Sequence, residues 1–156
     1  MEKESRKSFR KGNSFFYKNN YQEAIECYDK AIELNPEFTN AWIKKADSLN
    51  HLSKNQKALD CLEKALEIDP NNLSALLIKA SAYNNLEQYP EAITCCNQVL
   101  KLNPDNVSAL LRKGLYLVYI RKYKEAQVYL DKALKLDPNL PDGWMGKGVL
   151  YGELLS

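Results

Sequence analysis

The chain has 156 residues, of which 45% are hydrophobic and 27% are charged, a composition typical of a soluble globular protein. Its formal charge of +2 is too small to indicate nucleic acid or an anionic membrane surface as a partner. No apolar run approaches the ~20 residues of a membrane-spanning helix, and the N-terminal residues lack the apolar segment of a signal peptide. We therefore expect a cytoplasmic protein.

A tripeptide of the form Leu/Ile-Asn/Asp-Pro recurs four times. Its prolines are Pro36, Pro70, Pro104 and Pro138, each 34 residues after the one before. A constant spacing of this length indicates a stack of repeated structural units. Proline disfavours helix at the residue before it, so each tripeptide is expected to end one repeat.

Between consecutive prolines, the apolar residues fall at the spacing of two amphipathic helices. In the second repeat, the polar segment Ser53-Lys54-Asn55 separates these helices and is short enough to make them antiparallel neighbours. The pattern predicts helices at 5–18, 21–34, 39–52, 55–68, 73–86, 89–102, 107–120, 123–136 and 141–154. We therefore predict an all-α fold in a single domain (1–156), with repeats at about 5–38, 39–72, 73–106 and 107–140 and an unpaired helix at 141–156.

Small and bulky residues alternate at fixed positions of the repeat. One position of the first helix is occupied by Gly12, Ala46, Ala80, Gly114 and Gly148. One position of the second helix is occupied by Tyr28, Leu62, Cys96 and Leu130. This pattern predicts knobs-into-holes packing between the two helices of a pair.

The second repeat shows the full motif, with Trp42, Lys45-Ala46, Leu49, Ala58, Leu62, Ala65 and Pro70. This motif resembles the tetratricopeptide repeat (TPR) family, over the chain from about Ser5 onward. The resemblance implies a right-handed α-solenoid of antiparallel helix pairs, in which the first helices line a concave groove. Two departures stand out: tryptophan occurs only at Trp42 and Trp144, and lysine replaces the usual leucine at Lys11, Lys45, Lys79, Lys113 and Lys147. We expect the lysine stems to cover the helix pairs while acidic residues of the second helices offset their charge.

Residues that could carry chemistry are sparse. Cys27, Cys61 and Cys95 occupy one position in successive repeats, where helices lie at least ~8–10 Å apart, farther than a disulfide allows. His51 is the only histidine, and the glycines around Lys147 lack the strand and the Ser or Thr of a phosphate loop. We therefore expect reduced cysteines, no metal or cofactor site, and no enzymatic activity.

The resemblance places the binding residues on the first helices. There an apolar row alternates with amide and aromatic side chains, which would suit an extended peptide or a helix of a partner protein. The candidate groove comprises Phe9, Asn13, Phe16, Tyr17, Ile43, Asp47, Asn50, His51, Leu77, Ser81, Asn84, Asn85, Leu111, Leu115, Tyr119 and Met145. We therefore expect a non-catalytic protein-binding adapter whose partner is unknown. In the alternative, the apolar row only packs against neighbouring first helices.

Two ligand classes of related repeats are not expected. Members that grip the C-terminal tails of heat-shock chaperones use a carboxylate clamp, and of the matching residues Phe9, Asn13, Lys44, Ser74 and Ile78 only Asn13 fits it. Pentatricopeptide repeats, which bind single-stranded RNA, have a longer repeat and a basic groove. Neither a chaperone tail nor RNA is therefore the expected partner.

The last helix suggests a second function. A helix that ends a solenoid should present a polar outer face, yet this one carries the large apolar residues Trp144, Leu150, Tyr151 and Leu154. Either the chain is cut from a longer array, or this face docks on a partner or on a second copy in a homodimer. The alternative function is therefore a homo-oligomerising scaffold.

Overall fold

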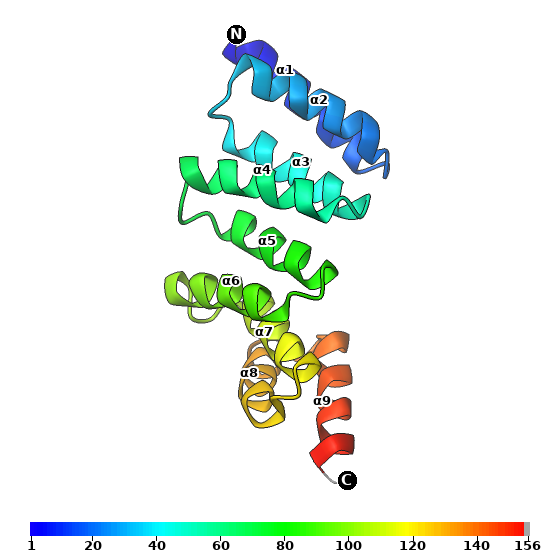
Figure 1. Ribbon diagram of the computed structural model, residues 1–156, viewed down its shortest axis with the longest axis vertical. Helices are drawn as coiled ribbons and strands as arrows, with labels where there is room; N and C mark the ends of the chain where they lie inside the picture. Colours follow the sequence, from blue (N-terminus) through cyan, green and yellow to red (C-terminus); the bar gives the residue numbers. More distant parts are fainter. Residues whose placement is uncertain (155–156) are drawn as a thin grey trace. The chain divides into compact units, whose positions relative to one another are not determined.

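The computed structural model describes residues 1–154, including the side chains of residues 1–153. The described residues form nine helices and no strand (Figure 1), which confirms the all-α repeat fold. The helices are α1 (Glu2–Phe16), α2 (Tyr21–Leu34), α3 (Thr39–His51), α4 (Asn55–Ile68), α5 (Leu73–Asn85), α6 (Tyr89–Leu102), α7 (Val107–Tyr119), α8 (Tyr123–Leu136) and α9 (Pro141–Leu154). None of them combines the length and the apolar character needed to cross a bilayer.

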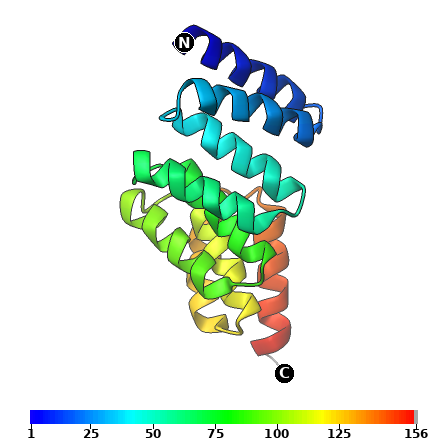
Figure 2. The same ribbon diagram turned by 45° about the horizontal axis from the view of Figure 1, so that its top comes forward.

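The helices fall into two compact units. Unit 1 comprises Met1–Asn85 and contains α1 to α5, and unit 2 begins at Leu86 and contains α6 to α9. The helices of each unit are stacked in chain order (Figure 2), so that α2 contacts α3 and α4 contacts α5 in unit 1, while α6 contacts α7 and α8 contacts α9 in unit 2.

The first helices of the pairs line one side of each unit. In unit 1, α3 contacts both α1 and α5, whereas no Cα atom of α2 lies within 8 Å of α4 in the described chain. In unit 2, α7 likewise contacts α9. Because neighbouring first helices approach more closely than neighbouring second helices, we call the surface of α1, α3 and α5 the inner face of unit 1 and that of α7 and α9 the inner face of unit 2.

The turn inside each pair contains a residue in the left-handed region of backbone conformation. These residues are Asn19, Ser53, Glu87 and Arg121, with φ between 57° and 61°. Since a residue of positive φ cannot continue a right-handed helix, the first helices end one or two residues earlier than predicted, at Phe16, His51, Asn85 and Tyr119.

The turns between repeats have the extended backbone that a following proline imposes. Asn35, Asp69, Asn103 and Asp137 have ψ values between 87° and 100°. The two tryptophans fasten two of these turns to the next helix. Trp42 Nε1 donates a hydrogen bond to the Pro36 carbonyl oxygen at 2.8 Å, and Trp144 Nε1 donates one to that of Pro138 at 2.9 Å.

The predicted alternation of small and bulky residues builds the core. A Cβ atom at Gly12 would lie 2.5 Å from Cε1 of Tyr28, and one at Gly114 would lie 2.7 Å from Cδ2 of Leu130. Both Tyr28 and Leu130 are fully buried. A Cβ atom at either position would force the facing side chain to shift, because the second helix lies against the backbone of the first.

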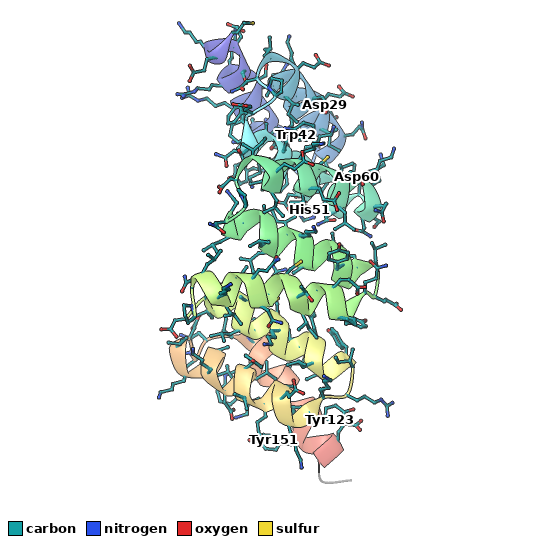
Figure 3. All side chains as sticks on the ribbon, turned by 60° about the vertical axis from the view of Figure 1, so that its left-hand side comes forward. Asp29, Trp42, His51, Asp60, Tyr123 and Tyr151 are labelled. Carbon is teal, nitrogen blue, oxygen red and sulfur yellow. The ribbon has the colours of Figure 1, made fainter. Side chains whose placement is uncertain are left out.

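Two lysines of the row pair closely with a carboxylate of the preceding second helix. Lys45 Nζ lies 2.5 Å from Asp29 Oδ1 (both in unit 1, where Figure 3 labels Asp29), and Lys147 Nζ lies 2.6 Å from Asp131 Oδ1 in unit 2. The side chains of both lysines are largely covered, at 22% and 16% exposure. These contacts account for Lys45 and Lys147 through packing and ion pairing inside each unit.

Candidate functional site

The cysteine thiols are poorly suited to chemistry. Cys27, Cys61 and Cys96 carry free thiols. Burial raises the pKa of Cys61 to about 11 and that of Cys96 to about 12. Since the thiolate is the nucleophile and the metal ligand, these side chains are almost entirely protonated near neutral pH. Among the described residues, no three His, Cys, Asp or Glu side chains form a group that could hold a metal ion.

The predicted apolar row of the inner face of unit 1 is only partly available to a ligand. Ile43 is 4% exposed and packs in the core with Ile25 and Leu49. Its placement in a ligand-binding surface is therefore wrong, because α3 is covered by helices on both sides. Phe9 is half-buried, with its ring centroid 4.8 Å from that of Phe38, and Leu77 on α5 is also half-buried.

The amide side chains of this face form hydrogen bonds within the protein. Asn13 Oδ1 accepts a hydrogen bond from the hydroxyl of the buried Tyr28 at 2.9 Å. Asn50 Nδ2 donates to the carbonyl oxygen of Ile78 at 3.4 Å and so joins α3 to α5. Asn50 Oδ1 is enclosed without a hydrogen-bond partner in the described chain. The observed hydrogen bonds of Asn13 and Asn50 are therefore made within the protein.

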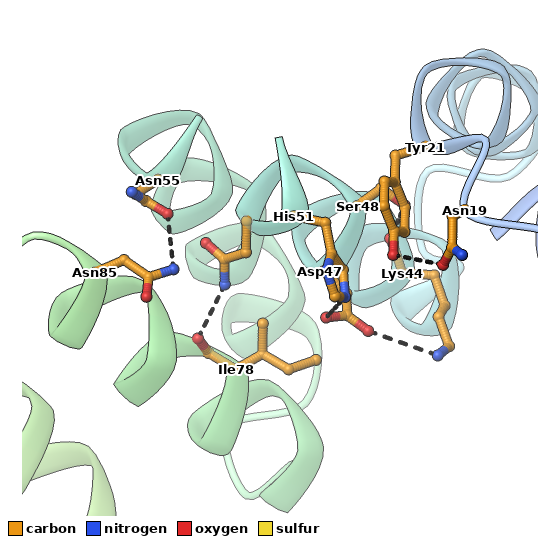
Figure 4. A network of polar contacts seen from close by, with 10 residues as sticks. Asn19, Tyr21, Lys44, Asp47, Ser48, His51, Asn55, Ile78 and Asn85 are labelled. Atoms are coloured by element: carbon orange, nitrogen blue, oxygen red, sulfur yellow. Dashed lines mark hydrogen bonds and ion pairs between the residues drawn. The ribbon is translucent and has the colours of Figure 1, made fainter. Parts of the chain in front are cut away.

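A further amide side chain, that of Asn85, lies at the end of the same face. Asn85 Nδ2 donates to Oδ1 of the buried Asn55 at 3.2 Å (Figure 4), while Asn84 and Ser81 are half-buried on α5. Asn85 as a whole is exposed at the end of α5. Of the predicted amides on α5, Asn85 thus has one group engaged within the protein.

An aromatic cluster forms where α1 ends and α2 begins. The rings of Tyr21 and His51 are stacked, with centroids 4.4 Å apart and planes at 1°. The Phe16 ring meets the His51 ring edge-on at 5.6 Å and the Tyr17 ring edge-on at 5.9 Å. Hence three predicted groove residues, Phe16, Tyr17 and His51, come together on the inner face of unit 1.

Two charged residues of α3 border this cluster. Lys44 Nζ lies 4.5 Å from the centroid of the Phe16 ring, a cation–π contact, and 3.7 Å from Asp47 Oδ2. Asp47 Oδ1 lies 3.9 Å from His51 Nε2, and Figure 4 shows these three α3 side chains beside Tyr21. From here on, the term aromatic cluster includes these two charged residues and denotes Phe16, Tyr17, Tyr21, Lys44, Asp47 and His51.

Two rings of the aromatic cluster are open to solvent, and its other four residues are half-buried. Tyr17 is 76% exposed, and the side chain of His51 is 48% exposed. The exposed rings of Tyr17 and His51 both contact Phe16, next to a lysine and a carboxylate. Together these groups offer apolar area and polar anchors, which is the composition of a recognition surface.

The predicted residues of unit 2 lie on its own inner face. Leu111 and Leu115 are half-buried against the core around Leu130. Tyr119 is 56% exposed with its ring centroid 5.2 Å from that of Tyr89, and Met145 on α9 is 65% exposed. Only Tyr119 and Met145 among the predicted residues therefore present a large accessible side chain in this unit.

The predicted self-association face of α9 is partly wrong. Leu150 is 2% exposed and packs with Leu117 and Leu130, so it belongs to the core of unit 2. Trp144 is 55% exposed and Tyr151 is 51% exposed, as that prediction requires. The side chain of Leu154 lies outside the described residues.

Sequence reasoning missed Tyr21 and gave Lys44 no part in the groove. A signal for Tyr21 was present, because tyrosine recurs at the same repeat position at Tyr89 and Tyr123. The first of these recurrences has the same role, since Tyr89 contacts Tyr119 as Tyr21 contacts His51. The cation–π contact of Lys44 has no such repeated signal.

The chain matches known proteins in sequence profile and in fold. Profiles of the tetratricopeptide repeat match residues 8–38, 39–72, 74–106 and 107–140. No curated protein matches the chain in sequence. Its fold is similar to that of TTC0263, a thermophilic TPR protein of Thermus thermophilus, with a TM-score of 0.80 and 19% identity over 96% of this chain and 82% of that one.

Two further solved structures are similar. YrrB, described as a TPR protein with an unusual peptide-binding site, has a TM-score of 0.77 and 23% identity over 94% of this chain and 75% of its own. The TPR domain of Arabidopsis OM64 has a TM-score of 0.73 and 26% identity over 75% of this chain and 97% of its own. All three similarities rest on low sequence identity and therefore describe the shared fold.

The profile matches follow one another along the chain and share the 34-residue spacing of its prolines. The structure has the antiparallel helix pairs that such repeats form, with the small residue of one helix packed against the bulky residue of the other. Repeats of this kind build protein–protein interaction modules. The chain therefore belongs to the tetratricopeptide repeat family.

Proposed function

We propose that the chain is a non-catalytic adapter that binds a peptide or helix of a partner protein on the inner face of unit 1. The observation that carries this proposal is the accessible aromatic cluster, in which Tyr17 is 76% exposed beside the half-exposed His51. The His51 ring is already held by its stack on Tyr21, so it loses little conformational entropy on binding.

The chemistry of the cluster favours an amphipathic peptide. The open ring of Tyr17 suits an aliphatic or aromatic side chain of the ligand. Asp47 and His51 can exchange hydrogen bonds with polar groups of the ligand. Lys44 adds a positive charge that can pair with an acidic group of the ligand. An enzymatic role has little support, since the buried thiols are protonated and His51 contacts rings and a carboxylate rather than a nucleophile.

The test uses a ligand selected on the protein itself. Twelve-residue peptides are selected from a displayed library on the full chain, and the tightest is titrated by calorimetry against the variants Tyr17→Ser and His51→Ser. Val128→Ser is the matched control, because Val128 is 65% exposed but lies on the second helix α8.

We expect each variant of the aromatic cluster to weaken binding at least about tenfold, which corresponds to about 1.4 kcal/mol. The control should bind as the unchanged protein does. Unaltered binding by both cluster variants, each with unchanged helicity, would place the peptide site elsewhere and reject the proposal.

A further inference from the structure

The terminal helix α9 has one face packed in the core and one face open. On the packed side, a Cβ atom at Gly146 would lie 2.8 Å from Leu115, and Leu150 is 2% exposed. On the open side, a Cβ atom at Gly148 would meet nothing within 4 Å, and the same holds for Gly152. Trp144 and Tyr151 beside them are about half exposed.

In earlier repeats, the corresponding face of the first helix is covered. Leu49 and Leu117 occupy the repeat position of Tyr151, and they are 5% and 2% exposed. Ala46 and Gly114 occupy the position of Gly148, and both are buried. In each of these repeats the cover is the second helix of the same pair, α4 over α3 and α8 over α7.

The covering helices share one pattern of residues. The pattern is Ala-x-x-x-bulky-x-x-Ala, and its members are Ala58, Leu62 and Ala65 in α4 and Ala126, Leu130 and Ala133 in α8. All six are fully buried. The bulky residue sits at the small residue of the first helix, as Leu130 does at Gly114, where a Cβ would come within 2.7 Å.

We infer that the open face of α9 is a docking site for an amphipathic helix of another polypeptide that carries this pattern. The bulky residue of the incoming helix enters the space above Gly148. Its two alanines allow close approach, and its apolar face covers Trp144 and Tyr151. The site belongs to unit 2 and shares no residue with the aromatic cluster of unit 1, so it extends the proposed function without depending on it.

The space at Gly148 makes the inference specific. An apolar surface alone would accept many partners, whereas the open space above a glycine favours a helix that places one large residue there, between two small ones. Trp144 is also held in position, since its Nε1 bonds the Pro138 carbonyl oxygen and Lys147 Nζ lies 5.7 Å from its ring centroid. The docking face is therefore formed before the partner arrives.

The probe for the test is a synthetic peptide of residues 122–137, which contains α8. Short free helices are marginally stable in water, so the peptide is bridged. Val128 is replaced by glutamate (Val128→Glu), and the new side chain is joined to that of Lys124 by a lactam. Both positions are on the exposed side of α8. The protein is the full chain with Trp42→Phe, which leaves Trp144 as the only tryptophan fluorophore. Burial of Trp144 then shifts its emission to shorter wavelength.

Two variants at one residue separate docking from folding. Gly148→Ala should still bind the peptide, because Ala46 fills the same position under Leu62. Gly148→Leu should weaken binding at least about tenfold, while its melting temperature stays equal or rises, since nothing lies within 4 Å of the new side chain's Cβ. A peptide with Leu130→Glu is the control ligand and should give no saturable shift.

The inference is overturned if the bridged peptide gives no saturable shift of Trp144 emission, or if Gly148→Leu binds it as the unchanged protein does. Light scattering tests the identity of the occupant, and a monomer is expected. A dimer that Gly148→Leu converts to a monomer would show that a second copy occupies the face and would reject the assignment to a separate helix.

Discussion

The rings of Tyr21 and His51 lie parallel, 4.4 Å apart, and join the first residue of α2 to the last residue of α3. The same two repeat positions meet one repeat later, where Asn85 donates a hydrogen bond to Asn55. They meet again in unit 2, where Tyr89 contacts Tyr119. These two repeat positions thus hold a ring stack, then a hydrogen bond between two side-chain amides, and then a second ring contact.

The stack of Tyr21 and His51 should contribute measurably to stability. Tyr21→Ala, His51→Ala and the double variant form a cycle, for which we expect a coupling of about 0.5–1.5 kcal/mol, typical of an aromatic pair. Urea unfolding of the four proteins measures it. Purely additive effects of the two substitutions would contradict an energetic contribution from the stack.

Replacing Arg121, the left-handed residue in the turn between α7 and α8, by glycine should stabilise the chain. Arg121 has φ of 61°, which costs a side-chain-bearing residue about 1–2 kcal/mol, and glycine returns part of this as greater entropy of the unfolded chain. Arg121→Gly is therefore expected to raise the free energy of unfolding by about 0.5–1 kcal/mol. Arg121→Ala is the control and should give no such gain in urea unfolding.

The lysine row has one place in unit 2 where its carboxylate is missing. Asn97 stands at the repeat position of Asp29 and Asp131, and Lys113 instead donates to the hydroxyl oxygen of Tyr129 at 2.6 Å. Asn97→Asp should restore the ion pair and stabilise the chain by up to about 1 kcal/mol. The gain should shrink in high salt and vanish in a Lys113→Met background; a gain that survives both would refute the pairing.

Stability should fall in alkaline solution because of the buried thiols. The pKa of Cys61 is raised by burial from 9.0 to about 11 and that of Cys96 to about 12. The unfolded chain therefore loses these protons first as the pH rises, which favours unfolding. The free energy of unfolding should be unaffected by these groups below about pH 8 and should fall above about pH 9, by up to about 1.4 kcal/mol per pH unit for each thiol.

The control for the alkaline effect is the double variant Cys61→Ala, Cys96→Ala. Its stability should decline less steeply between about pH 9 and 11, although burial also raises the pKa of Tyr28 and leaves a residual decline. An equal slope in the variant and the unchanged protein, measured by urea unfolding at each pH, would show that the thiols are not responsible.

The fold could be predicted because its causes recur at a fixed spacing. The proline at each repeat end, the small residue at Gly114 and the bulky residue at Leu130 each act on neighbouring helices. The left-handed turns were not predicted, since Ser53, Glu87 and Arg121 are not residues that favour positive φ. Their 34-residue spacing becomes visible only from the backbone.

The site was predicted less well because one repeat position has different surroundings along the stack. Ile43 and Met145 share a position, yet Ile43 is 4% exposed and Met145 is 65% exposed. The helix of Ile43 has first helices on both sides, whereas no described helix follows the helix of Met145. Periodicity assigns both residues to one row and carries no information about this difference in cover.

The central claim is that a partner peptide binds at the aromatic cluster of unit 1. Its most direct test is a titration of the isotope-labelled chain with the selected twelve-residue peptide, followed residue by residue in amide and aromatic NMR spectra. We predict that the largest shifts fall on Phe16, Tyr17, Tyr21, Lys44 and His51, with small shifts for α2 beyond Tyr21 and for α4. Shifts confined to the second helices, with the signals of Tyr17 and His51 unmoved at saturation, would contradict it.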